Sequence, residues 1–111
     1  MHLSIFTKKL TDIEKDLLET YLKTKTPRLE KFLTEFDEDA VKLQVIAEKF
    51  INKNAYKVEM ILEIPKIGNK PLCASEDSRD LQKAVDLAKD KLVEQIKKGM
   101  DLLHHQNQRA T

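Results

Sequence analysis

The amino-acid sequence predicts an α+β fold in two layers, in which a four-stranded sheet carries two helices on one face in the order β-α-β-β-β-α. Three observations support this prediction. Two segments in the middle of the chain alternate apolar and polar residues, as half-buried strands do. A helical apolar period runs through the last third of the chain, and a second helical segment precedes the alternating ones. With 111 residues, of which 41% are apolar, the chain suits one such domain.

The N-terminal region predicts a short strand and then a helix. Residues 2–6 alternate, which places Leu3 and Ile5 on one face. Thr11 is the expected N-cap of the helix, because its hydroxyl can accept a hydrogen bond from a free backbone N–H of the first turn. Glu14 follows three residues later, which completes the pattern of a capping box.

Pro27 lies inside the helical apolar pattern of this region, which continues at Leu29 and Leu33. Proline lacks the backbone N–H and clashes with the preceding turn, so it is unfavourable inside a helix. It suits the first turn of a new helix, here one capped by Thr26. We therefore expect a kink or break at residues 25–27.

The middle of the chain predicts an antiparallel hairpin. Residues 41–47 and 56–64 each alternate with the period of a half-buried strand, and residues 52–54 supply the turn between them. Ile46 and Ile61 interrupt the polar side of these strands. We interpret them as a cross-strand pair that stiffens the sheet. The alternative is a small apolar patch that supports weak self-association through the exposed sheet face or binds a protein partner.

The C-terminal third predicts a short strand and a long helix. The loop at residues 65–71 holds two prolines and a glycine, and residues 72–75 follow it as a short fourth strand. Asp77 or Ser78 is the expected N-cap of the last helix. The apolar residues of this helix fall on one arc at 3.6 residues per turn, up to about Leu103.

These elements predict a single domain over residues 1–104, followed by a polar tail at residues 105–111 that we expect to be frayed. The first strand–helix–strand unit favours a parallel pair with a right-handed crossover. The later strands follow as antiparallel neighbours. The alternation in the strands leaves one face of the sheet apolar, so both helices are expected on that face.

The charge balance and the absence of long apolar runs restrict the classes of function. The 20 basic and 19 acidic residues leave a formal net charge of +1, so any nucleic-acid contact depends on how the cations are arranged. No apolar run is long enough for a membrane span, and the segment MHLSIFTKKL lacks the apolar stretch of a signal peptide. Cys73 is the single cysteine, which agrees with a reducing compartment. We therefore expect a cytoplasmic protein with no membrane partner.

The residue types that enzymes and metalloproteins use form no recognisable pattern. The chain has no glycine-rich phosphate loop and no nucleophile with a partnered base. His104 and His105 are adjacent, so on a helix their side chains diverge by about 100° and do not have the spacing of a metal site. We expect no catalytic activity, no cofactor and no bound metal.

Three stretches of the sequence carry a family resemblance. They are KTPRLEK at residues 25–31, ASEDSRDLQKAVD at residues 74–86 and DKLVEQIKK at residues 90–98. Together they resemble the ribosome hibernation-promoting factor family, whose short members include the ribosome-associated inhibitor and some of whose members were labelled sigma-factor modulators. In the last helix, the positions that fit the family's pattern are Asp80, Ala84, Val85, Asp86, Lys91, Leu92, Gln95, Ile96 and Lys98.

The resemblance implies the β-α-β-β-β-α fold and a non-catalytic activity. Such a protein docks on small-subunit ribosomal RNA in the mRNA and tRNA region and blocks translation by idle ribosomes. Its partner is the small ribosomal subunit, and its site is a set of cations that reach phosphates. The candidate RNA-binding residues are Lys25, Arg28, Lys31, Lys83, Lys91, Lys97 and Lys98.

Lys83, Lys91 and Lys98 are spaced eight and seven residues apart, which predicts one stripe beside the apolar arc of the last helix. The cations of the first helix are expected to join this stripe across the groove between the helices. The other interpretation of the stripe is a solvated helix face whose lysines pair with neighbouring acids.

A second hypothesis of function is a protein-interaction domain of the same fold that has lost ribosome binding. The near-neutral net charge motivates it. Glu94 also motivates it, because the family usually carries arginine at this position. This hypothesis predicts a partner on the exposed sheet face rather than RNA on the helices.

Overall fold

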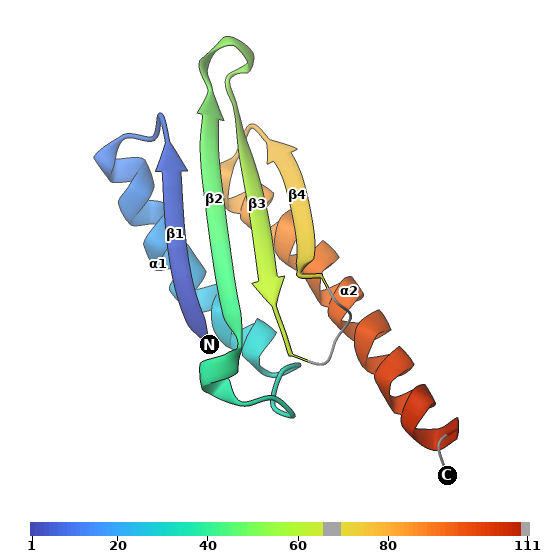
Figure 1. The fold of residues 1–111 in the computed structure, drawn as a ribbon. Coiled ribbons are helices and arrows are strands. Elements are labelled where there is room, and N and C mark those ends of the chain that lie inside the picture. Colours follow the sequence, from blue (N-terminus) through green and yellow to red (C-terminus); the bar gives the residue numbers. More distant parts are fainter. Residues whose placement is uncertain (66–69, 110–111) are drawn as a thin grey trace.

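Four strands form one layer of the molecule and two helices form the other (Figure 1). The computed structural model describes the backbone of residues 1–65 and 70–109, and the side chains of residues 1–65 and 70–104. The predicted α+β fold class and element order are confirmed. The elements are β1 (His2–Lys8), α1 (Asp12–Glu30), η1 (Glu38–Ala40), β2 (Lys42–Phe50), η2 (Ile51–Lys53), β3 (Ala55–Glu63), β4 (Leu72–Ser78) and α2 (Leu81–Arg109), where η is a 3-10 helix.

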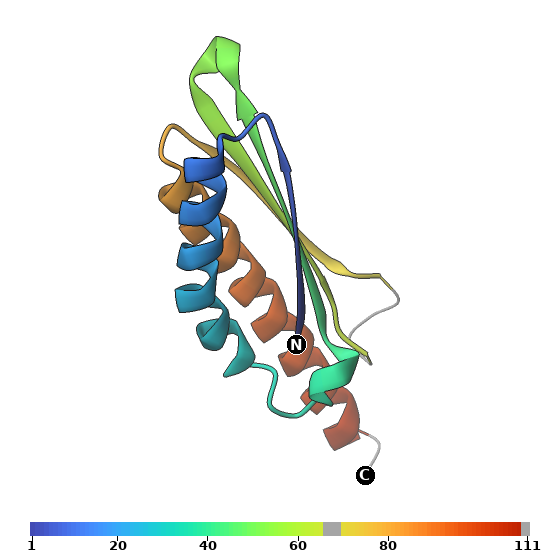
Figure 2. The same ribbon diagram turned by 90° about the vertical axis from the view of Figure 1, so that its left-hand side faces the viewer.

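The sheet is mixed, and its strands are neighbours in the order β1-β2-β3-β4. β1 and β2 run parallel, as the crossover through α1 requires, whereas β2–β3 and β3–β4 are antiparallel. Both helices lie on the same side of the sheet, and no described element lies on the other (Figure 2). We call these two sides the covered face and the bare face.

The start of α1 has the predicted capping box. The hydroxyl of Thr11 accepts a hydrogen bond from the backbone N–H of Glu14 at 3.2 Å. In return, Glu14 Oε1 accepts one from the backbone N–H of Thr11 at 2.9 Å. Two N–H groups that a helix start leaves without partners are thereby satisfied, which explains why α1 begins at Asp12.

The predicted break at residues 25–27 is wrong, because α1 continues through Pro27 to Glu30. Pro27 lies in the last turn, where its missing N–H costs a single helical hydrogen bond. Leu22 and Leu29 are each 1% exposed, so apolar burial holds the helix on both sides of the proline. Thr26 is therefore a helical residue and not an N-cap.

The turn between β2 and β3 is where it was predicted, and it sets the register of the hairpin. Residues 51–53 form η2, and Asn54 follows with a φ of 46°, a left-handed conformation that asparagine tolerates. The register pairs Ile46 with Glu59 and Gln44 with Ile61. The predicted direct pairing of the two isoleucines is therefore wrong: they are diagonal neighbours on the bare face.

The last helix begins later and ends later than expected. β4 pairs with β3 as far as Ser78, so Ser78 belongs to the sheet and does not cap α2. Asp80 has that role: its Oδ1 accepts from the N–H of Gln82 at 3.0 Å, and its carbonyl accepts from Ala84 at 3.0 Å. The helical backbone continues to Arg109, beyond the expected end near Leu103. The extent of the domain and the fraying of the tail stay predictions, and residues 66–69 of the predicted loop lie outside the described residues.

The core lies between the covered face and the two helices. The apolar arc predicted for α2 is confirmed, because its central residues are fully buried. Not every apolar residue of α1 lies in the core, since Ile13 and Leu17 are 74% and 51% exposed. The largest fully buried side chains are Leu18, Leu22, Leu29, Val41, Leu43, Val45, Val58, Met60, Leu62, Val85, Leu92 and Ile96. Burying each of these stabilises the fold by about 1.5–3 kcal/mol.

Candidate RNA-binding surface

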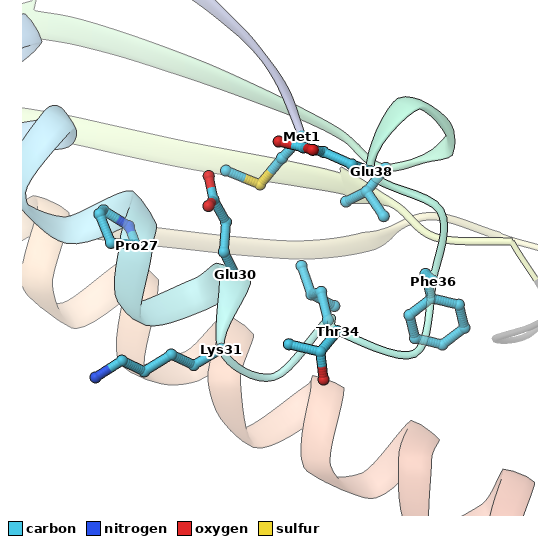
Figure 3. Close-up of a pocket in the computed structure, with 9 residues that line it drawn as sticks. Met1, Pro27, Glu30, Lys31, Thr34, Phe36 and Glu38 are labelled. Atoms are coloured by element: carbon cyan, nitrogen blue, oxygen red, sulfur yellow. Dashed lines mark ion pairs between the residues drawn. The ribbon is translucent and has the colours of Figure 1, made fainter.

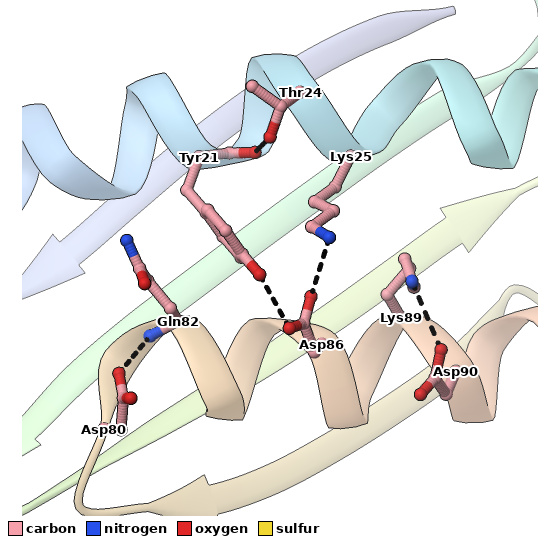
Figure 4. A network of polar contacts seen from close by, with 8 residues as sticks. All are labelled: Tyr21, Thr24, Lys25, Asp80, Gln82, Asp86, Lys89 and Asp90. Carbon is pink, nitrogen blue, oxygen red and sulfur yellow. Dashed lines mark hydrogen bonds and ion pairs between the residues drawn. The ribbon is translucent and has the colours of Figure 1, made fainter.

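The two helices are joined by a polar network that consists of Tyr21, Lys25 and Asp86 (Figure 4). The Tyr21 hydroxyl donates a hydrogen bond to Asp86 Oδ2 at 2.6 Å, and Lys25 Nζ lies 3.6 Å from Asp86 Oδ1. Lys25 Nζ also lies 5.1 Å from the centroid of the Tyr21 ring, a cation–π contact. Tyr21 and Lys25 are one turn apart on α1, which is why both reach one carboxylate of α2.

The electrostatics of this network leave little free charge. The hydrogen bond to Asp86, followed by burial and the negative charge of Asp86, raises the pKa of Tyr21 to about 12, so Tyr21 stays a neutral donor. The Lys25 side chain is 18% exposed, and its charge is compensated by Asp86. Lys25, a predicted RNA-binding residue, is therefore held in the packing between the helices.

Three other candidates lie at or near the end of α1. Lys97 of α2 places Nζ 5.4 Å from the ring centroid of Phe32, which directly follows Lys31 in the chain. Arg28 and Lys31 are exposed on the same end of α1. None of the three cations forms an ion pair within the part of the chain that the structure describes. We call Arg28, Lys31 and Lys97 the α1-end cluster.

Lys89 lies between the helices and was not among the predicted candidates. Its Nζ is 3.2 Å from Asp90 Oδ1, and the residue is only 9% exposed (Figure 4). A lysine this buried needs a paired acid, because desolvating an ammonium is costly. Its position three residues after Asp86, about 60° away on the helix, places it near the flank of α2 toward α1, so a helical wheel could have found it.

Of the lysines predicted to form one stripe on α2, Lys83 lies apart from Lys91 and Lys98. Lys91 Nζ is 2.5 Å from Glu76 Oε1, so Lys91 is on the flank of α2 toward β4. A step of eight residues turns a helix by about 80°, which separates Lys83 from Lys91, whereas Lys98 lies within about 20° of Lys91. The expected continuation from α1 across to Lys91 is therefore wrong, because that flank faces β4 and not α1.

Among the charged groups of the described residues, the carboxylate of Glu14 has the most strongly perturbed pKa. Tyr56 donates to Glu14 Oε2, and Lys49 Nζ lies 3.5 Å from the same oxygen. The hydrogen bond from the Thr11 backbone, followed by that from Tyr56, lowers the pKa of Glu14 to about 2. This carboxylate is ionised and fully paired. It joins the start of α1 to the hairpin and is unsuited to proton transfer near neutral pH.

Two cavities lie at opposite ends of α1. One of about 460 Å³ is lined by Met1, Lys31, Phe36 and Glu38 among others, with the Met1 amine 3.7 Å from Glu38 Oε1 (Figure 3). The other, of about 450 Å³, includes Tyr21, Tyr56 and Arg79. Neither cavity is lined by a nucleophile with a partnered base.

The described residues also bear on metal binding and on membrane insertion. Within residues 1–65 and 70–104, no group of three or more His, Cys, Asp or Glu side chains is placed to hold a metal ion. No helix of the described chain combines the length and the apolar character that a membrane span requires. The predicted absence of a cofactor, a metal and catalysis stays a prediction.

Fold and surface together define a class of protein: a small two-layer α+β domain with exposed cations on its helical layer. Within this class, the chain belongs to the family described as Sigma 54 modulation protein / S30EA ribosomal protein, which matches residues 8–103. The match covers most of the chain and confirms the resemblance seen in the sequence. The family is one of ribosome-associated factors and is not an enzyme family.

Two solved structures have a similar fold. The N-terminal domain of Protein Y from Thermus thermophilus is 22% identical, with a TM-score of 0.63 over 88% of this chain and 98% of that chain. A ribosomal subunit interface protein from Coxiella burnetii is 23% identical, with a TM-score of 0.56 over 88% of this chain and 96% of that chain. At these identities the likeness shows the shared fold. A search of curated proteins found no match.

Proposed function

We propose that the protein is a cytoplasmic hibernation factor that docks on small-subunit ribosomal RNA in the mRNA and tRNA region and thereby blocks translation by idle ribosomes. Membership of a ribosome-associated family supports the ribosome as partner. The observation that carries the docking surface is the α1-end cluster. There, cations from both helices are exposed and have no acid partner among the described residues.

The chemistry of docking is charge neutralisation by a rigid surface. Each cation that reaches a phosphate releases condensed counterions, so affinity falls steeply with salt. Arg28 offers a planar guanidinium, which binds two phosphate oxygens at once. Lys83 and Lys98 are also exposed on α2, with Lys98 on the flank of Lys91, and both widen the cationic surface of the helical layer. Lys25 and Lys91 contribute less, because each already pairs with an acid of its own chain.

The second candidate function is a protein-interaction domain that has lost ribosome binding. The observation that favours it is the internal pairing of Lys25 with Asp86 and of Lys91 with Glu76, which removes two of the predicted cations from the free surface. Glu94 is exposed on α2 and adds a negative charge to the same layer. This function needs no RNA contact.

Co-sedimentation with bacterial small subunits distinguishes the two functions. The protein is expected to bind at low salt and to dissociate as salt rises. The Arg28→Glu/Lys97→Glu variant replaces two cations that are expected to contact phosphates with two negatively charged side chains. The dissociation constant for small subunits should rise by at least about 100-fold. Each tenfold rise corresponds to a loss of about 1.4 kcal/mol of binding free energy.

The matched control is Lys53→Glu, which makes the same kind of charge change in the exposed hairpin turn. This variant should bind like the parent protein. Absence of binding at low salt by folded parent protein would exclude docking and favour the interaction domain. Equal loss in the control would show an effect of net charge and not of the α1-end cluster.

A further inference from the structure

The bare face of the sheet carries charged rows on either side of an apolar centre. The strand register defines four rows that cross the sheet from β1 toward β4. The first row is His2, Lys42 and Glu63; the second is Ser4, Gln44, Ile61 and Cys73; the third is Phe6, Ile46, Glu59 and Ser75; the fourth is Lys8, Glu48, Lys57 and Asp77.

The apolar centre lies in the two middle rows. Phe6 is 52% exposed and stands beside Ile46 in the register, while Ile61 is the diagonal neighbour of Ile46. Phe6 and Ile61 line a shallow depression of about 250 Å³ together with Ser4 and Gln44. Apolar side chains that are clustered, at least partly exposed and bounded by charged rows have the arrangement of an interaction surface, although Glu59 adds a charge beside Ile46.

The charges of the outer rows differ between the two halves of the face. The β1–β2 half is mainly basic, through Lys8 and Lys42, and the β3–β4 half is mainly acidic, through Glu63 and Asp77. Oppositely charged residues are register neighbours along the fourth row. Nevertheless, none of the charged lysine, glutamate and aspartate side chains on this face forms an ion pair within residues 1–65 and 70–104.

We propose that two copies of this chain pack bare face to bare face about a two-fold axis that runs parallel to the strands, between β2 and β3. This rotation lays β1 over β4 of the second copy and β2 over its β3, and each row meets itself. In the resulting dimer the charges of the two outer rows meet their opposites: Lys8 faces Asp77 of the second copy, Glu48 faces its Lys57 and Lys42 faces its Glu63. Glu59 of the third row faces Ile46 of the second copy and finds no opposite charge there, which weakens the dimer.

The size of the face predicts a weak dimer. Strands of seven residues at about 3.3 Å each, with four strands about 4.8 Å apart, span roughly 400 Å² per copy. Stable complexes bury about 800 Å² per partner, so the dimer should be weak. Both helical layers lie outside this interface (Figure 2), so dimerisation leaves the α1-end cluster open and does not depend on the proposed function.

Sedimentation equilibrium of the full chain, from about 10 µM to about 1 mM, tests the proposal. Lys8→Glu and Asp77→Lys each place like charges opposite each other twice in the dimer. Each should raise the dimer dissociation constant about 5- to 10-fold. An equimolar mixture of the two variants should dimerise like the parent protein, because every charge pair is restored in the mixed dimer. Phe6→Ser should weaken dimerisation, because Phe6 is the most exposed of the three apolar side chains.

The control is Lys23→Glu on the helical layer, which should dimerise unchanged. Circular dichroism shows that each variant is folded. A monomeric parent protein at about 1 mM would overturn the proposal. So would a dimer that tolerates Phe6→Ser, or single variants that are not rescued by mixing. The sheet variants should still co-sediment with small subunits, so failure of the dimer and failure of RNA docking are separate results.

Discussion

The two layers of this protein differ in how their charges are satisfied. On the helical layer, Lys25, Lys89 and Lys91 each find an acid of the same chain within 4 Å. On the bare face of the sheet, basic and acidic residues are neighbours in the register, yet the lysine and acid side chains there form no ion pair within the described residues. Proximity in the fold therefore does not decide which charges remain available. Helix packing orients side chains toward one another, whereas side chains of a bare sheet face stand out from it.

The largest expected effect tests whether only one face of the sheet is covered in the free protein. Leu62 and Ile61 are adjacent on β3 and point to opposite faces, and Leu62 is fully buried. Leu62→Ala should lower the free energy of unfolding by about 2–5 kcal/mol. Ile61→Ala, the matched control, should cost about 1 kcal/mol or less, since the side chain is partly solvated. Urea denaturation at low protein concentration measures both. If both variants lost the same free energy of unfolding, the Ile61 side of the sheet would also be buried in the free protein.

A smaller effect is expected from the network between the helices. Asp86→Asn keeps the shape but removes the charge that Tyr21 and Lys25 share. The free energy of unfolding should fall by about 1–2 kcal/mol. Binding to small subunits should tighten about two- to fivefold, because Lys25 becomes available for phosphate. Asp101→Asn makes the same charge change at an exposed position of α2 and should affect stability little. Unchanged subunit binding by Asp86→Asn would show that Lys25 does not reach the RNA.

Glu14 provides a test by pH. Its pKa is lowered from 4.5 to about 2, so the folded state holds its proton more weakly than the unfolded chain does. The stability that Glu14 contributes is therefore present above pH 4.5 and is lost as the pH falls toward 2. Near neutral pH, Glu14→Gln should cost about 1 kcal/mol, a value that allows for screening near the surface.

The measurement for Glu14 is the difference in free energy of unfolding between parent and variant as a function of pH. This difference should shrink as the pH is lowered through the stated range. Glu19→Gln, an exposed position of α1, serves as control and should show no such trend. A difference that stays constant with pH would mean that the Glu14 contacts contribute shape and not charge.

The smallest effect concerns the start of α2. Asp80→Ala should cost about 1 kcal/mol, because it removes the acceptor for the N–H of Gln82. Asp77→Ala should cost a few tenths of this value at protein concentrations where the chain is monomeric, because Asp77 lies in β4 with an exposed side chain. Thermal unfolding of the two variants side by side compares them. A larger loss of stability for Asp77→Ala than for Asp80→Ala would mean that Asp77 caps the helix, as the sequence predicted.

Local patterns were sufficient for the order and type of the elements. The capping box of Thr11, the turn before Asn54 and the apolar arc of α2 are all read from residues close together in the chain, and all three are confirmed. The same patterns erred where a neighbouring element decides the outcome. The pairing of β4 with β3 extends through Ser78 and thereby shifts the start of α2 to Leu81.

For the candidate site, the sequence by itself determined which residues carry charge and which helix each occupies. The tertiary structure decided how these charges are shared: Lys25 with Asp86, Lys91 with Glu76, Lys97 over Phe32 and Lys89 between the helices. It also decided that α1 passes through Pro27. The physical reason is the same in each case. Periodicity records which face of an element is apolar, whereas ion pairing, caps and tolerated proline depend on which flank the neighbouring element packs against.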